Sequence, residues 1–399
     1  PIAAHLPWFP RLLRDAGYYT TLVGKHHMTS EKPADGQVPQ DKPFDLVDPG
    51  RGPGNSGGHA TWGQTVEQRP KDKPFFGWFA AYDAHRGWDA DKQWDAQRFG
   101  PMHDPKNVVV PPFLSDDPKT RQDLASYYNE VTRFDYYIGE VVAELKKQGE
   151  LDNTLLFVLA DNGRPFPRAK TRLHDSGMKT ALVAHWPNGI KPSGQTCENL
   201  VSVIDLAPTI LKLARVEPPA TMQGVTLQPL FNEPSKSVRE FVFSEHNWHD
   251  YEAHGRAIRS GEWLLVRNFR PLLAWQGPAD SVRSDSHRQL QALRDAGKLS
   301  PAQADVFLAP RPDVELYRVT SDPHQLRNLT GQPNVAEIEK RLTTTLATWM
   351  DVTGDSVPAK ISQDLFDRET GDSLKLKSFR GTPAGADHNA PTINSPGPR

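Results

Sequence analysis

One apolar run constrains the fold of this chain more than any other feature. Six apolar residues, Leu155 to Ala160, end abruptly at Asp161, Asn162 and Gly163. A short continuous run bounded by turn residues is typical of a fully buried strand, as in a parallel sheet. Ligands bind at the carboxyl ends of such strands, and a carboxylate beside an amide oxygen suits a hard cation such as calcium. An Asp-Asn-Gly turn without a ligand is the simpler interpretation of this run on its own.

Two other predicted strands end in basic residues. Tyr18 to Val23 is rich in aromatic and β-branched residues, which favour a strand. Phe75 to Ala81 is a second apolar run of strand length. A lysine or histidine at a strand end can bind an anion, although a basic surface turn is the simpler interpretation of a strand end on its own. The candidate residues are Lys25 and His27 after the first strand, and His85 and Arg86 after the second.

The remaining patterns predict an α/β fold in two parts. The longest helical pattern, Lys119 to Gly149, leads directly into the run at Leu155, which forms an αβ unit of a parallel sheet. Further on, Ser260-Gly261 lies between two short apolar runs and indicates a β-hairpin, and Val335 to Met350 is amphipathic. The predicted parts are residues 1–252, a large, mixed and mostly parallel sheet flanked by helices; residues 253–360, a smaller antiparallel sheet with a helix; and residues 361–399, a polar tail that is extended or disordered.

The composition excludes several classes of protein. A net charge of -2 gives no sign of nucleic-acid binding. No run approaches the roughly 20 apolar residues of a membrane span. Cys197 is the single cysteine, which excludes an intrachain disulfide. Because the chain starts at Pro1 without a charged-then-apolar leader, we expect a processed or truncated chain. The sequence predicts no oligomeric state.

The strand-end residues are more informative together than singly. With Lys170, which follows Asn162 closely, they place cations, imidazoles and oxygen ligands at one edge of one predicted sheet. Such a set can bind a metal ion and a tetrahedral oxyanion, and it can protonate a leaving group. The sequence therefore predicts the hydrolysis of a sulfate or phosphate ester.

Three segments resemble signatures of the sulfatases, a family of the alkaline phosphatase superfamily. The stretch Leu155 to Gly163 resembles the metal-binding strand of that family. Its continuation through Pro165-Phe166-Pro167 to Lys170 is most similar to the heparan N-sulfatase (sulfamidase) branch, and so is the stretch Asp83 to Arg86. The other two segments are Gly17-Tyr18-Tyr19-Thr20 running into Gly24-Lys25-His26-His27, similar to G-Y-x-T…G-K-x-H, and Glu315-Leu316-Tyr317 with Asp322-Pro323 and Asn328-Leu329, similar to E-L-Y…D-P…N-L.

The resemblance implies an alkaline phosphatase-like fold, a sulfated glycan or small sulfate as substrate, and a periplasmic or secreted location. It also implies calcium, with magnesium as the alternative. A cation next to the sulfate would stabilise developing charge, and histidine titrates near neutral pH. The implied roles are sulfate binding by Lys25 and Lys170, assistance to the nucleophile by His27, protonation of the leaving group by His85, and metal binding by Asp161 and Asn162.

The chain departs from the family pattern at the nucleophile. The family uses a Cys or Ser in C/S-x-P-x-R, oxidised to formylglycine and upstream of G-K-x-H; the motif is absent, and Cys197 stands in another context. Calcium takes about 6–8 oxygens, more than Asp161 and Asn162 supply. We therefore expect either a fragment of a complete sulfatase, which the start at Pro1 favours, or a catalytically inactive glycan-binding homologue. A phosphatase or phosphonate hydrolase of the same superfamily is a further alternative.

We expect the second predicted part to form one wall of the cleft that contains the strand-end residues, and to bind substrate there. His246 and His249 follow a predicted strand, Phe241 to Ser244, and Arg259 precedes the hairpin turn. Ordinary surface histidines are an equally good interpretation of this pattern. The substrate-binding candidates are Arg86, His246 and His249.

Overall fold

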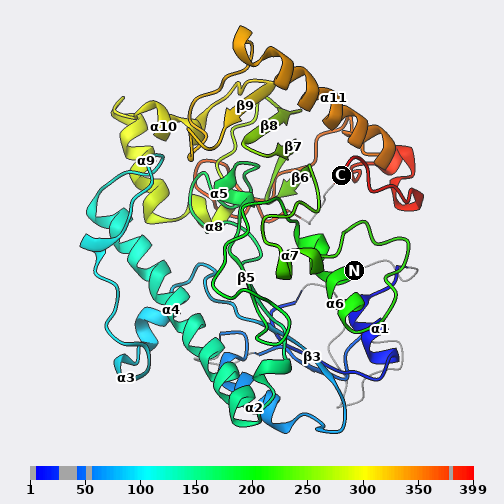
Figure 1. Ribbon diagram of the computed structural model, residues 1–399. Coiled ribbons are helices and arrows are strands. Elements are labelled where there is room, and N and C mark those ends of the chain that lie inside the picture. Colours follow the sequence, from blue (N-terminus) through cyan, green and yellow to red (C-terminus); the bar gives the residue numbers. More distant parts are fainter. Residues whose placement is uncertain (1–5, 27–42, 51–55, 377–380) are drawn as a thin grey trace.

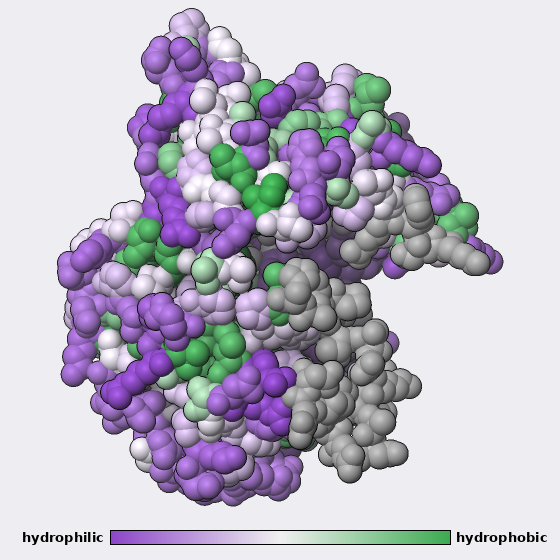
Figure 2. Space-filling model, turned by 90° about the vertical axis from the view of Figure 1, so that its right-hand side faces the viewer, coloured by the Kyte–Doolittle hydropathy of each residue, from purple (hydrophilic) through white to green (hydrophobic). Residues whose placement is uncertain are grey.

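The computed structural model describes residues 6–26, 43–50, 56–376 and 381–399 of the chain. Figure 1 shows two halves: most of the chain up to about residue 240 forms the lower half, and an antiparallel sheet with a long helix across it forms the upper half. The face drawn in Figure 2 is largely hydrophilic, with apolar residues in small separate groups. Among the described residues, no helix is both long and apolar enough to cross a membrane.

The lower half contains a parallel sheet in the order β2-β1-β3. Its strands are β1 (Tyr19–Gly24), β2 (Leu46–Asp48) and β3 (Phe75–Ala80). In register, Tyr19 lies opposite Phe75 and Thr21 lies opposite Leu46. These strands confirm two of the apolar runs as parallel neighbours, so the residues that follow β1 and β3 lie at one edge of the sheet.

Helices α2 (Trp62–Gln68) and α4 (Pro118–Lys147) pack against this parallel sheet. The predicted long helix is α4; Pro118 opens it, and the Asp117 carboxylate caps it by accepting from the backbone N–H groups of Lys119 and Thr120. Apolar side chains from β1, α2 and α4 form the shared core: Val23, Trp62, Val66, Tyr137, Val141 and Leu145.

The central apolar run forms β4 (Leu156–Leu159), but not in the predicted setting. Within the described chain β4 pairs only with β5 (Leu182–His185), and the pairing is antiparallel. All four residues of β4 are half-buried. The prediction of a fully buried parallel strand is therefore wrong. The connection from β4 to β5 contains only the four-residue helix α5 (Asp175–Met178), so the chain returns beside β4 in the opposite direction.

The upper half is an antiparallel sheet in the order β6-β7-β8-β9. The strands are β6 (Val242–His249), β7 (Tyr251–Ser260), β8 (Trp263–Asn268) and β9 (Val314–Arg318). The predicted hairpin is confirmed, because Ser260 pairs with Trp263 across a turn at Gly261. Helix α11 (Ala336–Thr353), the predicted amphipathic helix, packs against one face of this sheet through Leu342 and Leu346.

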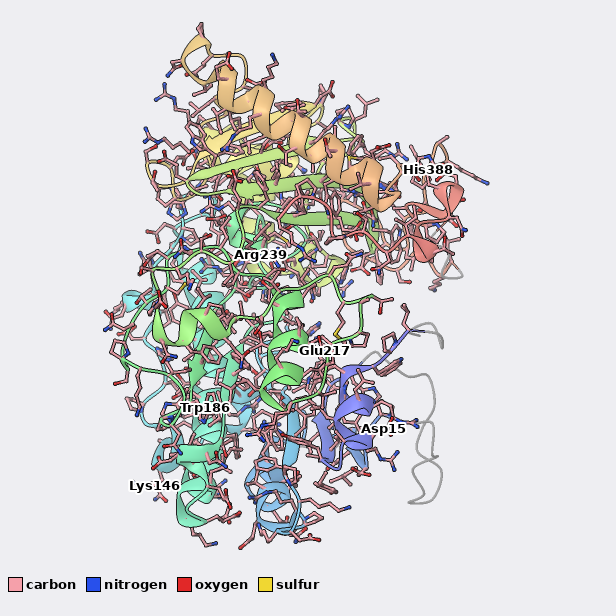
Figure 3. All side chains as sticks on the ribbon, turned by 45° about the vertical axis from the view of Figure 1, so that its right-hand side comes forward. Asp15, Lys146, Trp186, Glu217, Arg239 and His388 are labelled. Carbon is pink, nitrogen blue, oxygen red and sulfur yellow. The ribbon has the colours of Figure 1, made fainter. Side chains whose placement is uncertain are left out.

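The predicted division between residues 252 and 253 falls inside β7. Strand β6 belongs to the same sheet as β7, so a division before Val242 fits the strand pairing better. Figure 3 shows Arg239 where the chain passes from one half to the other, and there its guanidinium Nε donates to Asp205 Oδ2 at 3.0 Å. The assignment of separate domains stays a prediction.

The polar tail is packed rather than disordered in its described parts. Leu365 donates its backbone N–H to Asp250 O at 2.9 Å, and Arg368 Nη2 donates to Glu252 O at 2.9 Å. Asp364 holds the Arg368 side chain with a bond of 2.7 Å. Of the two predicted alternatives, extended or disordered, the described tail residues fit the first: the tail has little regular structure and is anchored on sheet β6-β7-β8-β9 by an arginine and backbone bonds.

The remaining elements are short. The α-helices are α1 (Phe9–Asp15), α3 (Ala96–Phe99), α6 (Leu206–Leu213), α7 (Gln228–Asn232), α8 (Ala279–Val282), α9 (Asp285–Asp295) and α10 (Pro301–Ala304). The 3-10 segments are His59–Thr61, Asp89–Gln93, Pro105–Asn107, Leu151–Asn153, Val203–Asp205, Asp305–Phe307, Pro333–Val335, Ala386–His388 and Ala390–Thr392.

Candidate functional site

Lys25 is held at the shared end of β1 and β3. Its backbone N–H donates to Ala80 O at 2.8 Å. Gly24 makes this approach possible: it has a φ of +109°, and a Cβ there would lie 2.0 Å from Ala80 O. The Lys25 ammonium lies 3.5 Å from Asp161 Oδ2. Two predicted strand ends therefore meet, whereas His27 lies outside the described residues.

Asp161 and Asn162 follow β4 directly, as predicted. The Asp161 side chain is 72% exposed, so its carboxylate is accessible to a ligand. Asn162 Nδ2 donates to Gly163 O at 2.7 Å, which turns the amide along the loop. Gly163 is required by close packing, because a Cβ there would lie 2.0 Å from Ser176 O. The Asp-Asn-Gly sequence therefore does form a turn, and that turn presents a carboxylate beside Lys25.

Lys170 lies on the loop after β4, between two buried arginines. The backbone φ is 58° at Arg168 and 71° at Thr171, values that are uncommon for residues with a side chain. Arg168 Nε donates to Asp305 Oδ2 at 2.9 Å, and Arg172 Nη2 lies 3.0 Å from the same oxygen. These bonds fix the unusual backbone and leave Lys170 between them at the wall of a cavity.

His85 follows β3 and is 44% exposed. Its Nδ1 lies 3.1 Å from Arg86 O; because a carbonyl oxygen only accepts, Nδ1 carries the hydrogen and donates it. Its Nε2 lies 3.6 Å from Asp280 Oδ2, at the start of α8. Nε2 is therefore the ring atom that can exchange a proton with a ligand. Sequence patterns gave no signal for Asp280, which is 195 positions further along the chain.

Arg86 is occupied by structural contacts. Its Nη1 and Nη2 each donate to Asp123 at 2.9 Å, and its Nε donates to Pro165 O at 2.7 Å. The guanidinium also stacks over the rings of Trp88 and Phe166. Burial alone would raise the pKa of Asp123, but the bonds from Arg86, Ser286 and Trp88 hold it below its usual value. This geometry favours a positioning role for Arg86 over the predicted contact with substrate.

His249 and His246 differ in what they can do. His249 Nδ1 lies 3.3 Å from Asp250 Oδ2, which also accepts from Ala279 N at 3.0 Å. Burial would raise the pKa of Asp250, but these partners and the charge of Lys170 hold it below its usual value. Burial lowers the pKa of His246 to about 3, helped by the charges of His249 and Arg172. His246 is therefore neutral at physiological pH, whereas the His249 imidazole is paired with Asp250.

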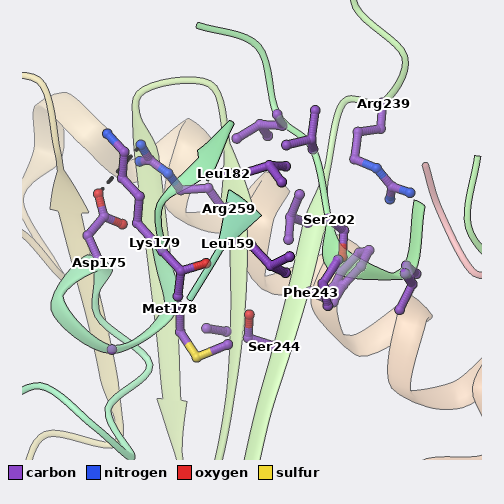
Figure 4. Close-up of a pocket in the computed structure, with 18 of the residues that line it drawn as sticks. Leu159, Asp175, Met178, Lys179, Leu182, Ser202, Arg239, Phe243, Ser244 and Arg259 are labelled. Carbon is purple, nitrogen blue, oxygen red and sulfur yellow. Dashed lines mark ion pairs between the residues drawn. The ribbon is translucent and has the colours of Figure 1, made fainter. Parts of the chain in front are cut away.

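A cavity of about 3000 Å³ is lined by residues of both halves. Its wall includes five of the predicted residues: Asp161, Asn162, Lys170, His246 and His249. Figure 4 shows another part of the wall, where Asp175 and Arg259 approach each other beside Lys179 and the apolar Met178, Leu159 and Leu182. The Arg259–Asp175 separation there is 3.8 Å. Lys25 lies next to this wall through Asp161, whereas neither His85 nor its neighbour Asp280 lines the described part of the cavity.

A second group of acidic residues also has ligand spacing. Asp83, Asp89 and Glu130 could hold a metal by distance alone. However, Arg133 Nη2 lies 2.7, 2.6 and 3.2 Å from these three carboxylates in turn, so a guanidinium already supplies the positive charge. Burial and the neighbouring Asp83 raise the pKa of Glu130 to about 9, which adds a proton there. Asp161 and Asn162 are the other oxygen donors available to a hard cation.

Comparison with known proteins identifies the family of this chain. Residues 1–216 match the model of the sulfatase family, and residues 168–276 match the N-sulphoglucosamine sulphohydrolase C-terminal model. An ulvan-active sulfatase from Formosa agariphila is 28% identical over 323 residues, 72% of this chain and 53% of that protein. Human N-sulphoglucosamine sulphohydrolase is 28% identical over 382 residues, 87% of this chain and 74% of that protein. The chain thus spans about half the length of the first relative and about three quarters of the second.

Solved structures show the same fold. A protein solved in complex with its substrate D-glucosamine-2-N,6-O-disulfate has a TM-score of 0.57 at 19% identity and covers 87% of this chain and 82% of its own. A 2-O GAG sulfatase has a TM-score of 0.59 at 17% identity, with coverages of 88% and 75%. These likenesses confirm the alkaline phosphatase-like α/β architecture that the sequence predicted. Because the sulfatase family model matches more than half of the residues of this chain, the chain belongs to the sulfatase family.

Proposed function

We propose that this chain carries the sulfate-binding, metal-binding and proton-donating residues of an enzyme that hydrolyses sulfate esters or sulfamates of a glycan. The observation that supports this proposal best is the 3.5 Å distance between the Lys25 ammonium and Asp161 Oδ2. Asp161 and Lys170 line the same cavity. Because the chain belongs to the sulfatase family, we assign sulfate binding and hydrolysis to this arrangement. A cavity of about 3000 Å³ exceeds the roughly 300–1000 Å³ of a drug-sized ligand site, which favours a glycan over a small ester.

The proposed roles follow from the charge of each group. Lys25 and Lys170 bind the sulfate oxygens, because two ammonium groups neutralise an oxyanion. His85 donates a proton from Nε2 to the leaving atom. His27 assists the nucleophile, a role that rests on the G-K-x-H resemblance alone. His246 and His249 line the substrate cavity.

The proposal includes a metal ion and a nucleophile. Asp161 and Asn162 offer oxygen donors that fit calcium, or magnesium as the alternative, and further donors are needed to complete the shell. A bound cation would withdraw charge from the sulfate oxygens. The nucleophile that fits the family is a formylglycine made from Cys or Ser in C/S-x-P-x-R, a motif outside these 399 residues.

The test is an assay of the full natural protein with calcium. Sulfate release is measured from an N-sulfated and an O-sulfated glucosamine, and phosphate release from the matched phosphate ester. We expect sulfate release to exceed phosphate release, and Lys170→Ala to lower kcat/KM. Lys146→Ala, a charge-matched change at the end of α4, should leave kcat/KM unchanged. Preference for phosphate would favour the phosphatase alternative, and glycan binding without turnover would favour an inactive homologue.

A periplasmic or secreted location is also part of the proposal. It follows from the resemblance to the sulfatases and from the polymeric substrate proposed here. Fractionation of the source cells, with an antibody against the chain, would test it. Recovery of the protein only from the cytoplasm would contradict this location.

A further inference from the structure

The Asp280 carboxylate stands next to the proposed proton donor. Asp280 Oδ2 lies 3.6 Å from His85 Nε2, which is longer than a hydrogen bond. The two side chains are 21% and 44% exposed, so the space beside them is accessible to a ligand. His85 Nε2 is therefore not hydrogen-bonded to Asp280 and can bond to a ligand. A leaving atom that hydrogen-bonds to Nε2 would also lie close to the Asp280 carboxylate.

The position of Asp280 is fixed by its neighbours. Ala279 and Val282, on either side of it in α8, are each only 1% exposed and pack with Tyr251. Ala279 N donates to Asp250 Oδ2 at 3.0 Å, which ties α8 to the turn between β6 and β7. Asp280 Oδ1 accepts from Ser281 N at 2.7 Å, and this leaves Oδ2 directed toward His85. The carboxylate is therefore held in place before any substrate binds.

We propose that Asp280 determines the specificity of this site, by selecting leaving groups that become cationic over those that stay neutral. The inference rests on the proposed function, in which His85 Nε2 protonates the leaving atom. Its substrate class is the sulfamate of an amino sugar, in which the leaving atom is nitrogen. An O-sulfate, in which the leaving atom is oxygen, gains nothing from the same carboxylate.

The difference between the two substrates lies in the charge on the leaving atom. In a sulfamate, the nitrogen takes the Nε2 proton and becomes positive, the N–S bond then breaks with its electron pair staying on nitrogen, and the sulfuryl group passes to an oxygen nucleophile. The released amine takes a further proton from water and leaves as an ammonium ion. In an O-sulfate, the oxygen takes the same proton as the O–S bond breaks, and a neutral alcohol leaves. A nearby carboxylate stabilises the positive nitrogen of the sulfamate reaction, whereas the O-sulfate reaction has no positive leaving atom for it to stabilise.

Binding of the amine product tests the inference without turnover. The chain is titrated with glucosamine and with N-acetylglucosamine, at a pH where the glucosamine amine is protonated, and binding is followed by NMR shifts or calorimetry. Because bonds to charged groups are strong, we expect glucosamine to bind roughly tenfold more tightly than the neutral amide. Asp280→Asn should abolish this preference. Asp72→Asn, which removes the same charge from an exposed loop, should preserve it. Equal binding of both sugars to the unaltered chain would overturn the inference.

Kinetics of the full natural protein separate this inference from the proposed function. In Asp280→Asn, kcat/KM for the sulfamate should fall roughly tenfold relative to kcat/KM for an O-sulfate of the same sugar. Equal losses on both substrates would overturn the specificity role and leave sulfatase activity intact. If neither substrate is hydrolysed, the proposed function fails, while the glucosamine titration still decides whether Asp280 recognises the amine.

Discussion

Two groups of charged residues share the loop after β4, and they are built differently. The buried group, here called the interface network, consists of Arg168, Arg172, Asp305, Arg311 and Glu315. Its bonds are short: Arg168 Nε lies 2.9 Å from Asp305 Oδ2, and Arg311 Nη2 lies 3.0 Å from both Asp305 and Glu315. The candidate site has side chains that are 21–72% exposed, and its separations are longer: 3.5 Å for Lys25–Asp161 and 3.6 Å for His85–Asp280.

The difference shows how one loop can be rigid and yet carry a binding site. In the interface network, Asp305 pairs with the arginines on both sides of Lys170. These pairs fix the backbone of the loop. The site residues are held by that backbone and by strand ends, while their charged atoms are only loosely paired. Loosely paired charges can exchange their partner for a ligand at little cost. We therefore expect changes in the site to affect activity, and changes in the network to affect stability.

The largest expected effect is on catalysis, from His85→Ala. For a sulfamate or alkyl sulfate, kcat/KM should fall by about 10²–10⁴-fold, because a general acid contributes that much. The loss should shrink for a nitrophenyl sulfate, whose leaving group departs without a proton. Unfolding free energy should change by less than about 0.5 kcal/mol, since the side chain is substantially exposed. A loss independent of leaving-group basicity would assign His85 to sulfate binding.

The opposite result is expected in the interface network. Arg311→Ala leaves the buried carboxylates of Asp305 and Glu315 short of a partner, so the free energy of unfolding should fall by about 3–5 kcal/mol. The matched control is Arg318→Ala, which breaks an exposed pair with Glu262 and should cost about 0–1 kcal/mol. Denaturant unfolding measures both. Similar losses in the two variants would contradict a stabilising network.

Calcium should distinguish the site from the other acidic group. At a calcium concentration about 100 times the dissociation constant, unfolding free energy should rise by about 2.7 kcal/mol. Asp161→Ala should remove this gain. Asp89→Ala should retain it, because Arg133 already neutralises that cluster. Thermal melts with and without calcium measure the gain; its loss in Asp89→Ala alone would move the metal to the Arg133 cluster.

The smallest effect is a pH dependence from a buried histidine outside the site. Burial lowers the pKa of His287 to about 4, below the 6.5 of an unfolded chain. Between these values only the unfolded state binds the proton, so stability falls as the pH falls from 6.5 to 4. His287→Leu should reduce the slope by about 1.4 kcal/mol per pH unit. Stability measured by denaturant unfolding at several pH values tests this, and an unchanged slope in His287→Leu would disprove a neutral buried imidazole.

The parts of the site that sequence patterns predicted are those set by local signals. Lys25, His85 and Asp161 each follow an apolar run that ends in a turn, and the structure places all three directly after β1, β3 and β4 or within a few residues of them. Such runs are recognisable because consecutive apolar residues indicate a strand in the core, and the turn residues directly after them indicate where the strand ends. The family resemblance then supplied their proposed roles.

Residues whose partners are distant in sequence escaped prediction. Arg86 was expected to bind substrate, and its partner Asp123 comes from α4. Asp280 reaches His85 only because α8 is tied to the turn at Asp250. The antiparallel pairing of β4 with β5 likewise depends on how the intervening loop packs, which periodicity does not encode. Long-range packing, rather than local pattern, decides these contacts.

The central claim is that Lys25, Lys170, Asp161 and Asn162 form one sulfate and metal site. A crystal structure of the full natural protein grown with calcium and sulfate tests it most directly. The account predicts a sulfate ion contacted by Lys25 and Lys170, and a calcium ion bound by Asp161 and Asn162 next to it. Sulfate bound away from both lysines, or calcium bound at Asp83, Asp89 and Glu130 instead, would contradict the account.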